Sequence, residues 1–399
     1  MASMPDLTSA AFKADPFPFY ARLRRESPVH EVMLPGKQRA WLVTRYADVL
    51  PLLKDERFVK SRAKVVANEA SYREPWMPAM FRPLARNMLD LDPPDHTRLR
   101  NSVQKAFTPR FVEMLRGRVE TIADDLLAKM RRNNRLDVIA DFALPLPTIV
   151  IAEMLGVPKT QQHRFHRWSK NIVAANWSKW SMIRAVPSVI AFIRYIRRLI
   201  ALKRTRPADD LVTALVTAHE ADDRLSDDEL LSMIFLLLIA GHETTVNLIG
   251  NGTLALLQHR SEMQRLRDDA SIVVPAIEEL LRFGSPLETA TERYAREPLT
   301  FAGTTLPAGA LVYAVLSSAN RDETVFDDPE RLNLTRDPNR HLSFGLGIHY
   351  CLGAPLARME GQIAIPALLR AFPNLRLTSE PLRWRRGLVL RGLERLRVE

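Results

Sequence analysis

The chain has 399 residues, of which 46% are hydrophobic, 26% charged and 7% aromatic. This composition is typical of a globular protein with a large core and excludes a disordered or fibrous chain. The formal net charge is +11. Because no zinc-finger spacing, RNP-type aromatic motif or basic repeat accompanies that excess, we expect no nucleic-acid partner.

The absence of linkers and the single cysteine limit the possible domain number and the kinds of metal or disulfide site. No Gly/Ser linker, low-complexity tract or internal repeat marks a boundary, so we predict a single domain over residues 1–399. The N-terminus lacks a signal pattern, and the longest apolar run, residues 230–241, is shorter than the ~20 residues that span a bilayer. One cysteine excludes an internal disulfide, a four-cysteine zinc site and an iron–sulfur cluster held by this chain alone. We expect a monomeric cytoplasmic protein without a membrane anchor.

Taken in chain order, the elements are mainly helical, and we predict a mainly α fold with small β-sheets. A first helix is expected in residues 16–28, followed by short extended pieces at 29–34 and 39–46. The proline pair of "LDPP" ends an extended segment, and a helix is predicted to start after it, over 95–107. A long helical region is expected to continue to about residue 207.

The most informative predicted helix starts at residue 227. Ser226 and Glu229 form a capping-box pattern, and acidic residues at 227–229 suit the positive end of the helix dipole. The next two turns are apolar on every side, which is expected of a helix that passes through the centre of a protein. If it runs to about Gln258, it is ~48 Å long at 1.5 Å per residue.

The apolar pattern of this helix breaks at "AGHETT", residues 240–245. The hydroxyl of Thr244 can bond the carbonyl of Ala240 one turn back, which weakens the helix ladder and leaves room for a water or a diatomic ligand. A simple kink with a satisfied polar pair explains the same stretch equally well.

The single cysteine lies in "FGLGIHYCLG", residues 344–353. A lone cysteine is usually a small buried hydrophobe. Here the glycines permit a sharp turn, and helical spacing over 354–372 places Cys351 just before a helix N-terminus, where a thiolate is stabilised. A thiolate is a metal ligand or a nucleophile. His349 is the obvious base for a nucleophile, but residues i and i+2 do not reliably face each other and no orienting Asn or Asp is evident, so axial ligation of an iron is favoured.

These motifs resemble those of the cytochrome P-450 superfamily of haem-thiolate monooxygenases. The cysteine segment resembles the haem-binding loop, and "AGHETT" resembles the oxygen-activating segment. "EELLR" (278–282) and "ANRDETVFDDPERL" (319–332) match in order and spacing, and "DPPDHTRLR" and "RGLERLRV" extend the likeness over nearly the whole chain. The resemblance is closest to soluble bacterial members and implies a cytochrome P-450 fold, with haem b between the long central helix and the cysteine loop.

The resemblance also assigns roles to individual residues. Cys351 would be the axial ligand of the haem iron, with Phe344 and Gly353 beside it. Four basic residues match positions that contact the haem propionates: His96, Arg100, Arg293 and His349. Ala240 and Gly241 would leave space for dioxygen, and the acid Glu243 and the alcohol Thr244 would deliver protons to it. Three residues match a structural network that holds the cysteine loop: Glu279, Arg282 and Arg331.

The implied activity is insertion of one atom of O2 into a lipophilic small molecule, by hydroxylation or epoxidation. No G-x-G-x-x-G lies between a strand and a helix, so electrons should come from a separate ferredoxin or flavodoxin with its NAD(P)H reductase. Two alternatives stay open. A peroxygenase of the same fold would use hydrogen peroxide and typically lacks the acid–alcohol pair, and a non-catalytic haem sensor or carrier would not need Glu243 and Thr244.

Two further expectations concern basic residues. Cations that flank the matched motifs are candidates for docking an acidic electron donor: Arg98, Lys105, Arg110, Arg340 and Arg358. Residues 159–208 contain twelve Lys or Arg and no Asp or Glu, together with Trp168, Trp177 and Trp180. In the family this stretch includes the lid over the substrate entrance. Solvated helix faces over a tryptophan-containing core are the favoured explanation, and attraction of anionic substrates or a membrane is the alternative.

Overall fold

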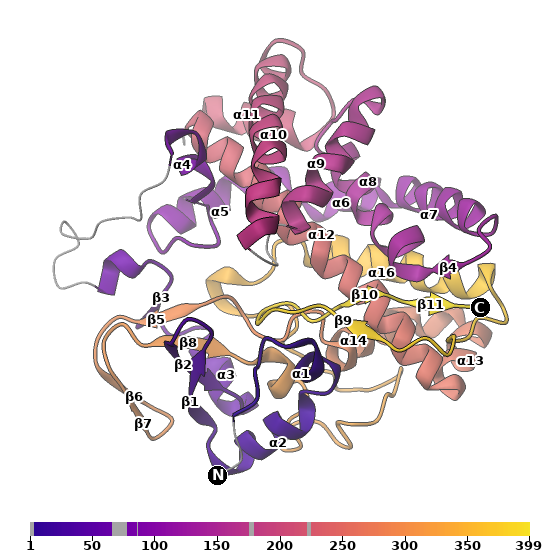
Figure 1. Ribbon diagram of the computed structural model, residues 1–399. Coiled ribbons are helices and arrows are strands. Elements are labelled where there is room, and N and C mark those ends of the chain that lie inside the picture. Colours follow the sequence, from indigo (N-terminus) through magenta and orange to yellow (C-terminus); the bar gives the residue numbers. More distant parts are fainter. Residues whose placement is uncertain (1–3, 66–77, 86, 175–178, 222–224) are drawn as a thin grey trace.

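The computed structural model describes residues 4–65, 78–85, 87–174, 179–221 and 225–399 (Figure 1). Helices form most of the molecule, and the five-stranded sheet lies at one side together with the N-terminal helices, whereas β4 (Leu136–Asp137), β10 (Leu393–Arg395) and β11 (Arg397–Val398) lie on the other side. The prediction of a mainly α fold with small sheets is therefore confirmed. The helices are α1 (Ala10–Ala14), α2 (Phe17–Glu26), α3 (Tyr46–Leu52), α4 (Arg82–Ala85), α5 (Asp95–Ala106), α6 (Pro109–Met114), α7 (Arg116–Met130), α8 (Pro145–Met154), α9 (Gln162–Ala174), α10 (Lys179–Thr205), α11 (Leu211–Ala221), α12 (Asp227–Gln258), α13 (Arg260–Asp268), α14 (Val273–Gly284), α15 (Leu316–Ala319) and α16 (Ala354–Ala371).

The largest sheet has five strands in the order β1-β2-β8-β5-β3, and three two-stranded pairs complete the β-structure. Strands β1 and β2 fall where extended segments were predicted, whereas the short β5 was not anticipated. The strands are β1 (Val29–Leu34), β2 (Gln38–Val43), β3 (Phe58–Val59), β4 (Leu136–Asp137), β5 (Arg293–Ala295), β6 (Leu299–Phe301), β7 (Thr304–Leu306), β8 (Leu311–Ala314), β9 (Arg383–Trp384), β10 (Leu393–Arg395) and β11 (Arg397–Val398).

Helix α12 is the central helix that the sequence predicts. Its capping box is formed: the Glu229 N–H donates to Ser226 Oγ at 3.2 Å, and the Ser226 N–H donates to Glu229 Oε2 at 2.7 Å. The helix is 32 residues long and ends at Gln258, as its pattern indicated. It is long and apolar enough to cross a membrane, but 61% of its most apolar window is buried inside the fold, as expected for a core helix.

Close packing around α12 fixes the position of the cysteine segment. Gly361 of α16 lies where a Cβ atom would come within 3.1 Å of Leu248 and 3.2 Å of Ile277. Because these two residues belong to α12 and α14, the glycine lets three helices approach one another at one point. Helix α16 begins three residues after Cys351, so this packing also anchors the cysteine loop beside the central helix.

Candidate active site

The loop that carries Cys351 depends on two glycines with positive φ. Gly345 has φ 67° and Gly347 has φ 75°, a conformation that disfavours residues with a Cβ atom. A Cβ atom on Gly347 would also lie 2.7 Å from the carbonyl oxygen of Leu53. The Cys351 N–H donates to the carbonyl of Phe344 at 2.9 Å, which closes the loop. The turn that the glycine spacing predicts is therefore formed, and it holds the cysteine at the N-terminus of α16.

The sulfur of Cys351 is influenced by the N-terminus of helix α16 and by two guanidinium groups. Burial raises the pKa of the Cys351 thiol above its ordinary value, while the N–H groups of Gly353 and Ala354 and the charges of Arg100 and Arg358 act to lower it. The helix terminus thus stabilises the thiolate as expected, and burial opposes it. Coordination to a metal ion deprotonates a thiol outright.

Phe344 and Arg358 form one wall of this loop. The Arg358 guanidinium lies 4.5 Å from the centre of the Phe344 ring, in cation–π geometry. Arg358 donates to both oxygens of Glu278 at 2.8 Å, and His341 contacts the same carboxylate at 3.1 Å. Arg358 is thus paired with Glu278 while partly exposed, which makes it a weaker docking candidate than an unpaired cation.

Four basic residues that the sequence singles out converge beside the cysteine loop. The rings of His96 on α5 and His349 in the cysteine loop are 4.4 Å apart between centroids. Arg293 on β5 is 5% exposed, and Arg100 lies one turn after His96 on α5. The structure adds Lys60, which donates to the carbonyls of Thr291 and Glu292 at 3.2 and 2.9 Å. No motif marks Lys60 in the sequence, since only the fold brings it to this cluster.

This basic cluster has buried donors that the protein itself leaves unsatisfied, although the charge of Asp92 acts on Lys60, His96 and Arg293. In the part of the chain that the structure describes, both ring nitrogens of His96, Nε of Arg293 and Nε2 of His349 are buried without a hydrogen-bond partner. Burial and then the neighbouring cations lower the pKa of His349 to about 2, and burial and the Arg293 charge lower the pKa of Lys60 to about 7. Buried polar groups without partners are rare in folded proteins. A ligand with two carboxylates beside a flat metal-binding ring fits this donor set, and the two propionates of haem b supply them.

The central helix presents a polar segment on the other side of the site. Thr244 Oγ1 donates to the Ala240 carbonyl at 2.8 Å, as expected from the sequence, and Thr245 Oγ1 donates to the Gly241 carbonyl at 3.1 Å. Ala240 and Gly241 are exposed although they lie in the middle of a core helix. A Cβ atom on Gly241 would lie 3.2 Å from Ile151 of α8, so this glycine also serves helix packing and not only the space for a ligand.

Two buried carboxyl groups border the polar segment. Glu243 is 3% exposed, and burial raises its pKa to about 7, opposed by the charge of Arg385. Glu360 on α16 is 1% exposed, and burial raises its pKa to about 8, opposed by a hydrogen bond with Thr245. A carboxyl whose pKa is near neutrality can both give and take a proton, which is the property that a proton relay requires. Glu360 and Arg385 carry no signal in the sequence that would separate them from ordinary core and surface residues.

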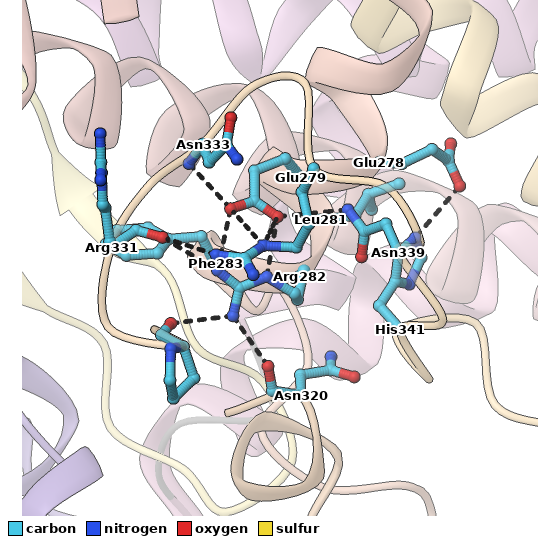
Figure 2. Close-up of polar contacts among 12 residues, drawn as sticks. Glu278, Glu279, Leu281, Arg282, Phe283, Asn320, Arg331, Asn333, Asn339 and His341 are labelled. Atoms are coloured by element: carbon cyan, nitrogen blue, oxygen red, sulfur yellow. Dashed lines mark hydrogen bonds and ion pairs between the residues drawn. The ribbon is translucent and has the colours of Figure 1, made fainter. Parts of the chain in front are cut away.

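Figure 2 shows the buried network behind the cysteine loop, which is centred on Glu279. Arg282 donates through Nε and Nη2 to the two oxygens of Glu279, each at 2.8 Å, and both side chains are fully buried. The Asn333 N–H and the Asn339 amide donate to the same carboxylate at 3.0 and 3.2 Å. The i, i+3 pair that the sequence predicts is confirmed, and the partners from residues 333–339 join α14 to the chain that leads into the cysteine loop.

The prediction that the Arg331 side chain joins this network is wrong. The side chain of Arg331 is exposed, and Figure 2 shows it directed away from Glu279. Its main-chain carbonyl accepts from Arg282 Nη2 at 3.3 Å. The second guanidinium on Glu279 belongs to Arg336, whose Nε lies 3.2 Å from both carboxylate oxygens. The chain turns between the two arginines, so that the later side chain points inward.

The remaining candidates for docking an electron donor differ in whether an acidic residue pairs with them. Arg98 forms ion pairs with Glu229 and Asp95, which leaves Lys105, Arg110 and Arg340 as exposed cations. On the basic helices, Trp168 is half-buried against Tyr195, with 5.6 Å between the ring centroids, which agrees with the expected tryptophan-containing core. Trp177 and the side chain of Trp180 lie outside the described residues.

Comparison with known proteins agrees with this geometry. The family model for cytochrome P450 matches residues 151–390. The polyketide biosynthesis cytochrome P450 PksS of Bacillus subtilis is 44% identical, over 97% of this chain and 96% of its own. Its solved structure, at 43% identity, superposes with a TM-score of 0.91 and covers 99% of both chains. The 6-deoxyerythronolide B hydroxylase of Saccharopolyspora erythraea is 40% identical over 100% of this chain and 99% of its own. The myxobacterial CYP267B1, solved in complex with myristic acid, is 42% identical, with a TM-score of 0.89 and 99% coverage of both chains.

A long polar-interrupted helix that faces a cysteine loop and a basic cluster defines the haem-thiolate class of monooxygenase. The chain belongs to the cytochrome P450 family, and its cofactor is haem b.

Proposed function

We propose that this monooxygenase hydroxylates or epoxidises a lipophilic small molecule of polyketide or fatty-acyl type, with electrons from a separate ferredoxin or flavodoxin. The observation that carries the proposal is the intact pair of Glu243 and Thr244 on α12, at the exposed turn beside Ala240. A protein that only bound a ligand at haem would gain nothing from a buried carboxyl with a pKa near neutrality at this place.

The residues around the cofactor would have different roles in holding it. Bound haem b with a thiolate ligand supplies the activation of dioxygen for O–O cleavage. Cys351 would hold the iron, Phe344 and Gly353 would line the ligand loop, and the basic cluster would neutralise the propionates: His96, Arg100, Arg293 and His349, with Lys60. The buried nitrogens of His96, Arg293 and His349 that lack partners support the propionate-binding role.

Proton delivery is assigned to α12. Thr244 Oγ1 donates its own hydrogen to the Ala240 carbonyl, so its lone pairs remain to hold a water molecule and direct the proton of that water toward dioxygen. Glu243 would supply protons from solvent by exchanging partners, which a pKa of about 7 permits at neutral pH. The network of Glu279, Arg282 and Arg336 would keep the cysteine loop in place without taking part in the chemistry.

The substrate class rests on the relatives. PksS is named for polyketide biosynthesis, the Saccharopolyspora erythraea enzyme hydroxylates 6-deoxyerythronolide B, and CYP267B1 was solved with myristic acid. These molecules are large and mostly apolar, which agrees with the apolar first half of α12 that leads to Ala240. For the electron donor, the exposed cations Lys105, Arg110 and Arg340 are the proposed docking residues, because ferredoxins are commonly acidic. We place the protein in the cytoplasm as a monomer.

Turnover with a surrogate ferredoxin system and NADH tests this proposal. Compounds are first screened for a substrate-induced spin-state shift of the haem, and the products of the hits are then analysed. An oxygenated product formed with O2 and NADH supports the monooxygenase. Product formed only with hydrogen peroxide would favour the peroxygenase, and ligand binding without any product would favour the sensor or carrier.

A further inference from the structure

The C-terminal hairpin of β9 and β10 lies directly against the central helix. The Arg385 N–H donates to the Gly392 carbonyl at 2.9 Å across the hairpin. A Cβ atom on Gly392 would lie 1.9 Å from Oδ1 of Asn247, a residue of α12. Only a glycine permits this approach, so the place of Arg385 relative to α12 is fixed within a small range.

Three polar residues spaced by four form one stripe along α12: Glu243, Asn247 and Asn251. The Asn251 amide donates to the carbonyls of Gly284 and Arg391 at 3.0 and 2.9 Å. The Asn247 amide donates to the Pro286 carbonyl at 3.3 Å. Two of the three residues therefore fasten the hairpin and the loop after α14 to the same face of the helix.

The third residue of the stripe is the acid that the proposed function uses, and it meets a cation of the same hairpin. Arg385 Nη1 lies 3.8 Å from Glu243 Oε1, with the two side chains 13% and 3% exposed. Among the charged groups that the structure describes, Arg385 is the one that acts on the charge of Glu243. Arg385 is also influenced by Glu394, an exposed residue on the opposite strand of the hairpin. The guanidinium thus lies between a buried carboxylate and a solvent-facing one.

From this geometry we propose that Arg385 is a positioning residue that holds the Glu243 carboxylate. Proton delivery by Glu243 therefore depends on the packing of the C-terminal hairpin against α12. The inference rests on the proposed function, since it requires Glu243 to be the proton donor. Removal of the guanidinium leaves burial unopposed, so the Glu243 pKa rises further above its ordinary value. An opposite charge at this distance shifts a carboxyl pKa by about one to three units.

The test compares Arg385→Met and Arg385→Gln with Arg385→Lys, which keeps the charge, in the purified holoenzyme. Arg383→Met is the matched control, because Arg383 is an exposed arginine two residues earlier in the same hairpin. Two quantities are measured against pH. The first is the infrared band of the protonated Glu243 carboxyl, identified by its loss in Glu243→Gln, and the second is the rate of oxygen consumption.

Protonated Glu243 is the donor, so the rate of oxygen consumption falls as pH rises through its pKa. In Arg385→Met and Arg385→Gln, both the infrared titration and this alkaline limb should move up by about one to three pH units. Arg385→Lys and Arg383→Met should stay near the wild-type values. An unchanged infrared titration without the Arg385 charge would overturn the inference. A shifted titration with an unchanged rate profile would show that Glu243 is not the donor, which refutes the proton role in the proposed function while the ion pair stands.

Discussion

Replacement of Glu279 by Gln removes one negative charge from the network behind the cysteine loop without changing the size of the side chain. Arg282 and Arg336 then keep buried positive charges that face a neutral amide. The Glu279 and Arg282 side chains are fully buried, and five hydrogen-bond donors from four residues point at the one carboxylate. Loss of one partner of a buried ion pair costs about 3–5 kcal/mol. Glu279→Gln should lower the free energy of unfolding by this amount.

Urea unfolding followed by circular dichroism measures the change. With a slope of about 3 kcal/mol/M for a chain of this size, the midpoint should fall by about 1–2 M. Glu278→Gln is the neighbouring comparison, because Glu278 and its partner Arg358 are partly exposed, so this loss should cost less than that of the fully buried Glu279. Arg336→Met should destabilise like Glu279→Gln, whereas Arg331→Ala should have little effect. Equal midpoints for Glu279→Gln and Glu278→Gln would refute the reasoning.

Three further outcomes are expected. Thr244→Ala should keep haem content and substrate binding, while NADH consumption yields less product and more hydrogen peroxide. Thr245→Ala should change the ratio of product to hydrogen peroxide less. A larger change in Thr245→Ala than in Thr244→Ala would show that the Thr245 hydroxyl directs the proton. Charge reversal at the exposed docking candidates Lys105, Arg110 and Arg340 should slow reduction of the haem by an acidic ferredoxin, most strongly at low salt. Reduction rates that change neither with charge reversal nor with salt would exclude this surface as the docking site. Since burial raises the Glu360 pKa to about 8 in the folded protein, stability should fall as pH rises from about 4.5 through 8. Urea midpoints measured over this range should decline less in Glu360→Gln, and parallel declines would contradict the assignment.

Local patterns account for the parts of the fold that the sequence predicted. The capping box at Ser226 and Glu229 depends on residues within one turn, and it marks the start of α12 correctly. The glycine spacing around Cys351 predicts the turn for the same reason, because Gly345 and Gly347 permit the positive φ angles that the turn requires. Thr244 also bonds within its own helix, as expected from its position.

Contacts between distant segments were out of reach of such patterns. Arg331 lies at the end of the motif and Arg336 lies five residues later, and only the turn of the chain decides which side chain reaches Glu279. Lys60 and Arg385 are far in sequence from the residues that they contact in the fold, and no flanking motif marks either of them. The burial of Cys351, which raises its pKa against the stabilising N–H groups of the helix terminus, is a property of the folded molecule that no local pattern gives.

The absorption spectrum of the reduced protein with carbon monoxide tests the central claim most directly. Ligation of the haem iron by the Cys351 thiolate predicts the far red-shifted Soret band of a haem-thiolate protein, and Cys351→His should lose it while haem remains bound. A wild-type band at the position of histidine-ligated haem would contradict the assignment of Cys351 and the proposed function that depends on it.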